Sequence, residues 1–220
     1  MRRRLKLWEF LLELLYPTRC AFCHQLTQNG AGVCPRCREK LPYTRGAGLK
    51  QSFPHVSECV SPLYYEGDVR ASLLRYKFHG VTAYAKVYGE FLSKSIDESQ
   101  ISCDIITWVP LSRRRLRRRG YDQARLLAEE LAGRMGLPCA ALLRKTRDNP
   151  AQSGTGNAAK RKANVAGLYE PVQPELFQGK RVLLVDDIVT TGATLSECAK
   201  TLHTAGAARV SAITVARRRD

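Results

Sequence analysis

The chain has 220 residues, of which 44% are hydrophobic and 25% are charged, and its formal net charge is +16 at pH 7. This is the composition of a globular protein with one good core and room for a small appendage, and no segment is long and apolar enough to cross a bilayer. The excess of basic residues favours polyanionic partners, namely nucleic acid, phosphorylated metabolites or an anionic membrane, over a surface that is basic only for solubility.

Residues 1–17 start with a basic segment and an apolar run, as a signal peptide does. Glu9 and Glu13 interrupt the run and no small-residue cleavage site follows, so we expect a chain that stays in the reducing cytoplasm. The run predicts a helix packed on the protein's own body, with a membrane-surface anchor as the alternative. Its apolar residues fall on one helical face: Leu5, Trp8, Leu11, Leu12 and Leu15.

Four cysteines follow as two closely spaced pairs, "CAFC" and "CPRC". Two Cys-x-x-Cys pairs on either side of a glycine-containing return are typical of a tetrahedral Zn²⁺ site, and disulfides are disfavoured in a reducing compartment. A closed four-thiolate site leaves no open position for substrate, so we expect it to be structural. The predicted zinc ligands are Cys20, Cys23, Cys34 and Cys37.

The remainder of the chain predicts two domains and a regular order of elements. Residues 43–55 are rich in glycine and polar residues and predict a linker between a zinc module at 1–45 and a larger domain at 56–220. Helices are expected within 68–95, with a break at Gly80, and at 122–136 and 194–206. Strands are expected at 58–67, 103–111, 137–147, 165–170, 180–187 and 208–218.

Strands that alternate with helices predict an α/β fold with a parallel sheet covered on both faces. Ligands of such sheets bind at the carboxyl ends of the strands, which is where Asp186 and Asp187 end a buried apolar run. The following "VTTGATL" offers hydroxyls, a glycine and the free amides of a helix start, and therefore predicts a phosphate site. Paired carboxylates suit a ribose diol, so a sugar 5-phosphate would satisfy both the carboxylates and the phosphate site. The alternative is a metal site, or a helix cap formed by Asp187.

The string "LLVDDIVTTGATL" resembles the phosphoribosyl pyrophosphate (PRPP) motif of the type I phosphoribosyltransferases. The resemblance implies a type I phosphoribosyltransferase-like fold that binds PRPP or a related ribose 5-phosphate ligand. It implies that Asp186 and Asp187 hold the ribose hydroxyls. It assigns the 5′-phosphate to Thr190, Thr191, Gly192, Ala193 and Thr194.

A second resemblance covers almost the whole chain. The order of the cysteine quartet, "YKFHG", "VPLSRRRLRRRGYDQA" and the PRPP motif is similar to that of the ComF family of bacterial competence-associated proteins. The chain departs from the family's usual Val-Pro-Val-Pro and Arg-Gly-Phe-Asn-Gln segments with "TWVPLS" and "RGYDQ". The resemblance implies handling of single-stranded DNA during uptake, with competence proteins such as a DNA helicase as partners.

By the type I resemblance, the pyrophosphate of PRPP is expected at the loop after Pro110, formed by Leu111, Ser112 and Arg113. Lys77 of "YKFHG" is a second pyrophosphate candidate, or else a solvated helix residue. Magnesium is expected to arrive with PRPP and to keep several waters. We expect the polar loop at 147–162, with its Lys160 and Arg161, to close over the site.

The segment "RRRLRRR" begins at Arg113, beside the expected pyrophosphate loop. Arginine guanidinium groups pair well with phosphate oxygens, so this run is the expected surface for single-stranded DNA, with Tyr121 as the nearby aromatic; a solvated basic loop is the alternative. The DNA-binding candidates are Arg114, Arg115, Arg117, Arg118 and Arg119.

Two functions remain open at this point. The chain is either a PRPP-binding protein that acts in DNA uptake through single-stranded DNA, or an active phosphoribosyltransferase of nucleotide or base salvage. The second would transfer 5-phosphoribosyl from PRPP to an acceptor and release pyrophosphate. No base-binding pocket is recognisable in the sequence, so catalytic residues are not assigned.

Overall fold

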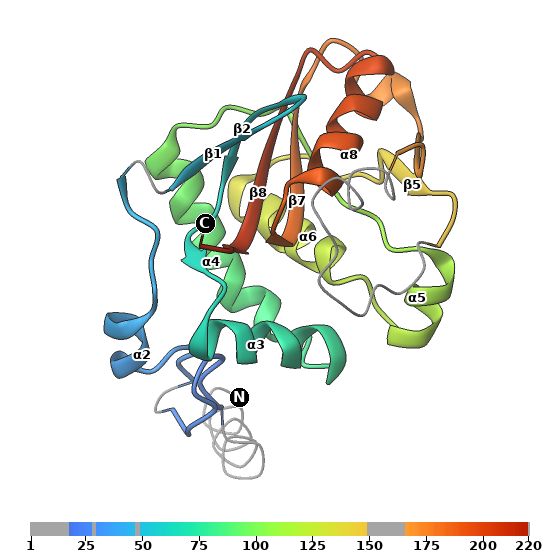
Figure 1. The fold of residues 1–220 in the computed structure, drawn as a ribbon. Coiled ribbons are helices and arrows are strands. Elements are labelled where there is room, and N and C mark those ends of the chain that lie inside the picture. The colour runs from blue at the N-terminus through green and yellow to red at the C-terminus, as the bar shows by residue number, and fades with distance from the viewer. Residues whose placement is uncertain (1–17, 28–29, 47–48, 149–165, 220) are drawn as a thin grey trace, which may run out of the picture.

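The structure is a computed structural model, and it describes residues 18–27, 30–46, 49–148 and 166–219 (Figure 1). The predicted helix within residues 1–17 lies outside the described residues, as do most of the predicted closing loop and its Lys160 and Arg161. Within the described part, no helix has the length and apolarity that crossing a bilayer requires.

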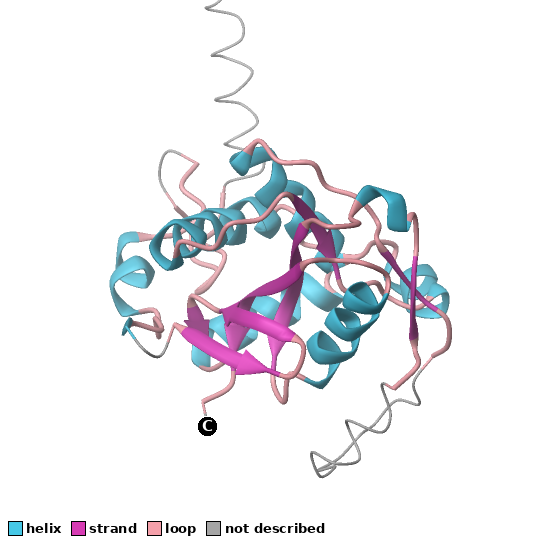
Figure 2. Cartoon of the chain, turned by 90° about the horizontal axis from the view of Figure 1, so that it is seen from above, coloured by secondary structure: helices cyan, strands magenta, loops and turns pink. Residues whose placement is uncertain are grey.

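A mixed sheet forms the centre of the molecule (Figure 2). Its strands are ordered β1(Lys50–Phe53)-β2(Val56–Val60)-β8(Arg209–Arg217)-β7(Arg181–Val189)-β4(Ile105–Trp108), and the short β3(Leu63–Tyr64) also pairs with β8. All pairs are parallel except β1 with β2. The predicted α/β fold with a parallel sheet is confirmed.

Helices cover both faces of this sheet, and each face has its own core. On one face, α3(Gly67–Phe78), α4(Tyr84–Ser99) and α6(Gln123–Met135) pack against Leu183 and Val185 of β7. On the other, α8(Ala193–Thr204) packs against Val182 and Leu184. Because successive strand residues point to opposite faces, the continuous apolar run of β7 supplies both cores.

Three segments differ from the sequence prediction. The linker predicted at 43–55 contains β1, which pairs with β2 at the sheet edge. The strand expected at 137–147 pairs with β4 through a single bridge, Cys139 with Ile106. It then forms β5(Leu143–Lys145), which pairs with β6(Tyr169–Pro171) in a separate antiparallel sheet. The arginine run is a helix, α5(Arg113–Arg119), between the N-cap Ser112 and Gly120, a left-handed residue.

Candidate functional site

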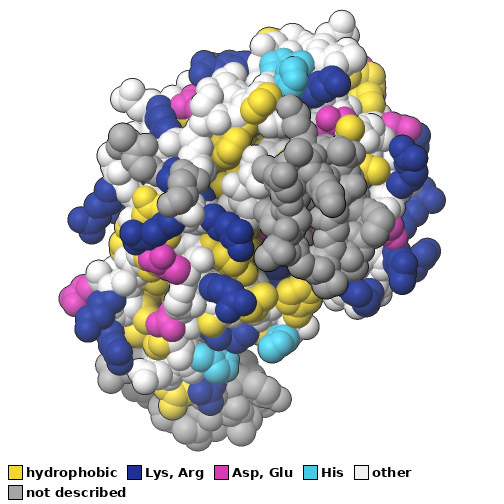
Figure 3. All heavy atoms as spheres, in the orientation of Figure 1, with side chains coloured by type: hydrophobic (Ala, Val, Ile, Leu, Met, Phe, Trp, Pro, Cys, Tyr) yellow, Lys and Arg dark blue, Asp and Glu magenta, His cyan; other side chains and the backbone are white. Residues whose placement is uncertain are grey.

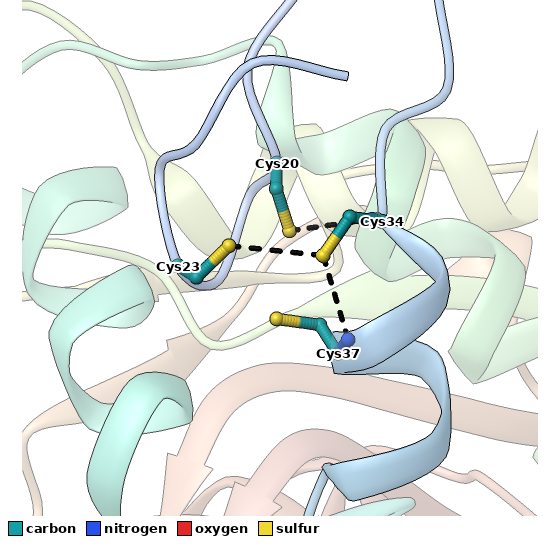
Figure 4. A group of neighbouring side chains, drawn as sticks. All are labelled: Cys20, Cys23, Cys34 and Cys37. Carbon is teal, nitrogen blue, oxygen red and sulfur yellow. Dashed lines mark hydrogen bonds between the residues drawn. The ribbon is translucent and has the colours of Figure 1, made fainter. Parts of the chain in front are cut away.

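The four predicted zinc ligands converge in space (Figure 4). Their sulfur atoms lie within 4.8 Å of one another, and the Sγ atoms of Cys23 and Cys34 are 3.7 Å apart. Cys34 caps the short helix α2(Pro35–Lys40), and its sulfur accepts the amide of Cys37 at 3.4 Å, as a thiolate in a metal site would. The sulfur donor set and its spacing fit a structural Zn²⁺ ion.

The remaining cysteines are not near this cluster. Cys59, Cys103 and Cys198 are buried, as predicted for small apolar residues, and Cys139 is half-buried. His24, which follows the first cysteine pair, directs Nδ1 to the hydroxyl of Tyr84 at 3.3 Å.

Asp187 lies at the carboxyl end of β7, on the face covered by α3. It is 3% exposed, and its Oδ1 lies 2.9 Å from Nζ of Lys77. Its Oδ2 is buried and has no hydrogen-bond partner among the described residues. Burying an acceptor without a donor costs free energy, so this oxygen marks a place where a ligand hydroxyl would be stabilising.

Asp186 is half-buried, and its surroundings belong to the opposite core, with Cys198, Tyr169 and Lys145 near its charge. Its Oδ1 accepts the backbone amide of Asp187 at 2.8 Å. Burial and the neighbouring charge of Asp187 raise the pKa of Asp186 well above its usual value, and Lys77 opposes that shift. The two carboxylates therefore lie in different environments, and the charge of Lys77 acts on both of them.

The loop after β7 leads into α8 at the same end of the sheet. Thr190 and Thr191 are exposed, whereas Ala193 and Thr194 are half-buried in the first turn of α8. Gly192 is the N-cap, and no side chain caps the helix, so its first amides are available to an anion. Gly192 has a φ of 69°, and a Cβ there would collide with the ring of Phe53, so glycine is required at this position by its own neighbours.

The expected pyrophosphate loop is held by an aspartate that the sequence reasoning overlooked. Asp122 is 9% exposed; its Oδ2 accepts the amide of Leu111 at 3.0 Å, and its Oδ1 caps α6. Burial raises the pKa of Asp122. The Ser112 hydroxyl oxygen accepts the amide of Arg115, and Arg113 is exposed. The signal for Asp122 was available, because an aspartate directly before a helical pattern is a typical N-cap.

The arginines of α5 differ in their exposure to solvent. Arg114, Arg117 and Arg118 are exposed, and Arg115 is half-buried. Arg119 turns inward: its Nη1 donates to Oε1 of Gln123 at 2.8 Å, and its guanidinium lies 4.8 Å from the ring of Phe78. The segment is a helix rather than a loop. Four of its six arginines are exposed, and the question of DNA binding or simple solvation stays open.

A groove of about 1010 Å³ runs between α5, the start of α6 and β5. Lys and Arg side chains gather beside α5 and β5 at the right-hand edge of the face in Figure 3. Trp108 lines the groove, with the guanidinium of Arg125 over its ring at 5.8 Å. Tyr121 also lines it, but its hydroxyl donates to the carbonyl of Tyr76. The basic residues along the groove are Arg113, Arg114, Arg117, Arg125, Arg144, Lys145 and Arg147.

Comparison with known proteins identifies the relatives of this chain. The phosphoribosyl transferase domain family matches residues 119–220, and the double zinc ribbon domain family matches residues 11–48. Competence protein F of Haemophilus influenzae is 25% identical over 224 aligned positions, and the alignment covers 90% of this chain and 96% of that protein. Competence protein ComFC of Streptococcus pneumoniae is 27% identical over 200 residues, 91% and 76% of the two chains. The chain is a homologue of these competence proteins over about nine-tenths of its length.

Other known proteins resemble the chain over a similar share of its length. The DNA utilization protein YhgH of Escherichia coli K12 is 29% identical over 203 residues, which cover 87% of this chain and 86% of that protein. A solved adenine phosphoribosyltransferase from Thermoanaerobacter pseudethanolicus has a TM-score of 0.43 at 16% identity, over 77% of this chain and 95% of that one. By the two family matches and the cysteine cluster, the chain combines a phosphoribosyltransferase-type domain with a cysteine module of zinc-ribbon type.

Proposed function

We propose that the protein binds PRPP, or a closely related ribose 5-phosphate ligand, at the carboxyl end of β7. The observation that carries the proposal is the buried, unpartnered Oδ2 of Asp187 directly before the uncapped start of α8. The helix start would hold the 5′-phosphate, and Asp186 and Asp187 would accept the ribose hydroxyls. Magnesium would enter with the pyrophosphate and keep part of its water shell.

A calorimetric titration compares magnesium–PRPP, ribose 5-phosphate and pyrophosphate on the same protein. Each fragment satisfies only part of the site, so PRPP should bind at least tenfold more tightly than either. Equal affinity for PRPP and pyrophosphate would contradict the ribose and phosphate assignments, because it would show that only the pyrophosphate is recognised.

We further propose that single-stranded DNA binds along the groove between α5 and β5. Exposed arginines on α5 supply backbone contacts, and Trp108 offers an aromatic face on the groove wall. The names of the competence relatives support a role in DNA uptake. The partner that we propose for this role is a DNA helicase of the competence machinery. A reducing cytoplasmic site of action follows from the need to keep four cysteine thiolates available for zinc.

The DNA proposal is tested by the salt dependence of binding. Single strands lose affinity with a log–log slope of about −0.7 per phosphate contact, so replacing Arg114, Arg117 and Arg118 by Ser should flatten the slope by about 2. The control replaces three exposed lysines on other helices, Lys86, Lys94 and Lys200, and removes the same charge. If both triple variants change the slope equally, the groove is not the DNA surface.

The alternative is an active phosphoribosyltransferase. The phosphoribosyl transferase domain match favours it, and pyrophosphate release from PRPP in the presence of a candidate acceptor separates it from a protein that binds PRPP without turnover. In a transferase, charge develops on the departing pyrophosphate, so magnesium and nearby basic groups would stabilise the transition state.

A further inference from the structure

Helix α3 contacts both the cysteine cluster and the acid pair. Arg75 donates from Nη2 to the carbonyl oxygens of Ala21 and Phe22, at 3.0 Å and 2.6 Å. These two carbonyls belong to the turn between Cys20 and Cys23. Two residues further along the same helix, Lys77 reaches Asp187. Figure 1 shows α3 between the N-terminal segment and the sheet.

The same turn is anchored in the main core by Phe22, which is 1% exposed. Its ring packs edge-on against Tyr88 and Phe91 of α4, with centroid distances of 6.2 Å and 5.8 Å. Tyr88 in turn packs against Tyr76 of α3 at 5.3 Å. A displacement of the turn would therefore shift α3 through two sets of contacts, the Arg75 hydrogen bonds and the packed aromatic rings.

A metal ion would fix the shape of this turn. Four thiolates around one Zn²⁺ carry a net charge of about −2, which favours a guanidinium beside the cluster. Without the ion, the two cysteine pairs lose their cross-link, and the carbonyls that accept from Arg75 are no longer held in place. Arg75 is half-buried, so its hydrogen bonds to these carbonyls are partly shielded from water.

We propose that Arg75 is a positioning residue that couples zinc in the cysteine cluster to the Lys77–Asp187 pair, so that zinc binding and PRPP binding strengthen each other. The PRPP half of this statement rests on the proposed function. Coupling between two binding sites is reciprocal, so the ligand must raise the affinity for zinc by the same factor by which zinc raises the affinity for the ligand.

The first test uses zinc-loaded Arg75→Met, which keeps the side-chain length and removes the donors. We expect about a tenfold weaker affinity for magnesium–PRPP, or about 1.4 kcal/mol, with one zinc per chain retained. Arg75→Lys should recover part of the loss, because an ammonium can still donate to one carbonyl. Arg70→Met, at an exposed arginine of the same helix, is the matched control. Parent-like PRPP affinity in Arg75→Met would overturn the proposal.

The second test first measures the effect of zinc on α3 in the absence of PRPP, and then the effect of PRPP on zinc binding. Hydrogen exchange of the parent protein, with no PRPP present, should show faster exchange in residues 67–78 after zinc is removed by a chelator. Exchange that changes only within residues 18–41 would overturn the proposal. At saturating magnesium–PRPP, the zinc affinity measured by equilibrium competition with a chromogenic chelator should rise in the parent and stay unchanged in Arg75→Met. A parent that fails to bind PRPP refutes the proposed function, and the exchange result then decides the role of Arg75 separately.

Discussion

The surroundings of Asp186 disfavour the charged form of its carboxyl group. Its raised pKa follows from burial and from the charge of Asp187, and Lys77 offsets only part of that effect. A carboxyl whose pKa is higher in the folded than in the unfolded state stabilises the fold at low pH, and this stability is lost as pH rises through the folded pKa. Ionisation of Asp186 in the apo protein therefore lowers the stability of the fold, and a ligand hydroxyl that donates to the carboxylate would offset part of this cost.

The first prediction follows from that sign. Asp186→Asn should raise the Tm of the apo protein at pH 8, flatten the decline of Tm above pH 5, and weaken PRPP binding. Thermal melts between pH 5 and 8, with and without magnesium–PRPP, check it. A Tm at pH 8 that is unchanged or lower in the variant would show that the Asp186 charge is compensated in the folded protein.

At the scale of elements, the loop between β7 and α8 depends on its contact with β1. Gly192→Ala places a side chain in a left-handed conformation and against Phe53, and should destabilise the protein by about 1–2 kcal/mol from the backbone alone. In the double variant with Phe53→Ala, the part of the destabilisation that comes from the clash with the ring should disappear. The part that comes from the left-handed backbone should remain. Urea unfolding of the four proteins in this cycle measures the difference, and strictly additive effects would contradict direct contact.

The sequence predicted most elements because local signals agreed with the fold. Gly136 ends α6 and the break at Gly80 separates α3 from α4, as expected from their patterns. Three segments differ from their prediction, and only one of them differs for a non-local reason. The Leu143–Lys145 strand finds its partner in Tyr169–Pro171 rather than beside β4, and α5 forms despite like charges because Ser112 and Gly120 define its ends.

At the scale of the whole molecule, the cysteine module shares the core of the larger domain. Phe22, Val33 and Leu41 belong to the same buried cluster as residues of α3 and α4, so the module is packed on the sheet domain. The spacing of the cysteines predicted the cluster. No local pattern revealed that the turn within it packs the ring of Phe22 against α4. Strand alternation alone predicts that Asp186 and Asp187 point to opposite faces of the sheet. That Lys77 lies near both carboxylates could be seen only in the folded structure.

Metal removal should consequently affect more than the module. Cys34→Ser should abolish the one zinc per chain found by elemental analysis of the reduced parent protein, and lower the Tm of the entire protein as well as loosening residues 18–41. Replacement of the distant buried Cys103 by Ser is the control and should retain zinc. Freshly reduced parent protein without metal would refute the zinc assignment.

The central claim is that the acid pair of β7 recognises the ribose of PRPP, and one titration tests it most directly. Magnesium–PRPP is titrated into the parent and into Asp186→Asn/Asp187→Asn, with zinc content and apo Tm measured on both. Hydrogen bonds to charged groups contribute about 1.5–3 kcal/mol each, so the double variant should bind on the order of a hundredfold more weakly while remaining folded and zinc-loaded. Parent-like affinity in the folded double variant would contradict the ribose assignment.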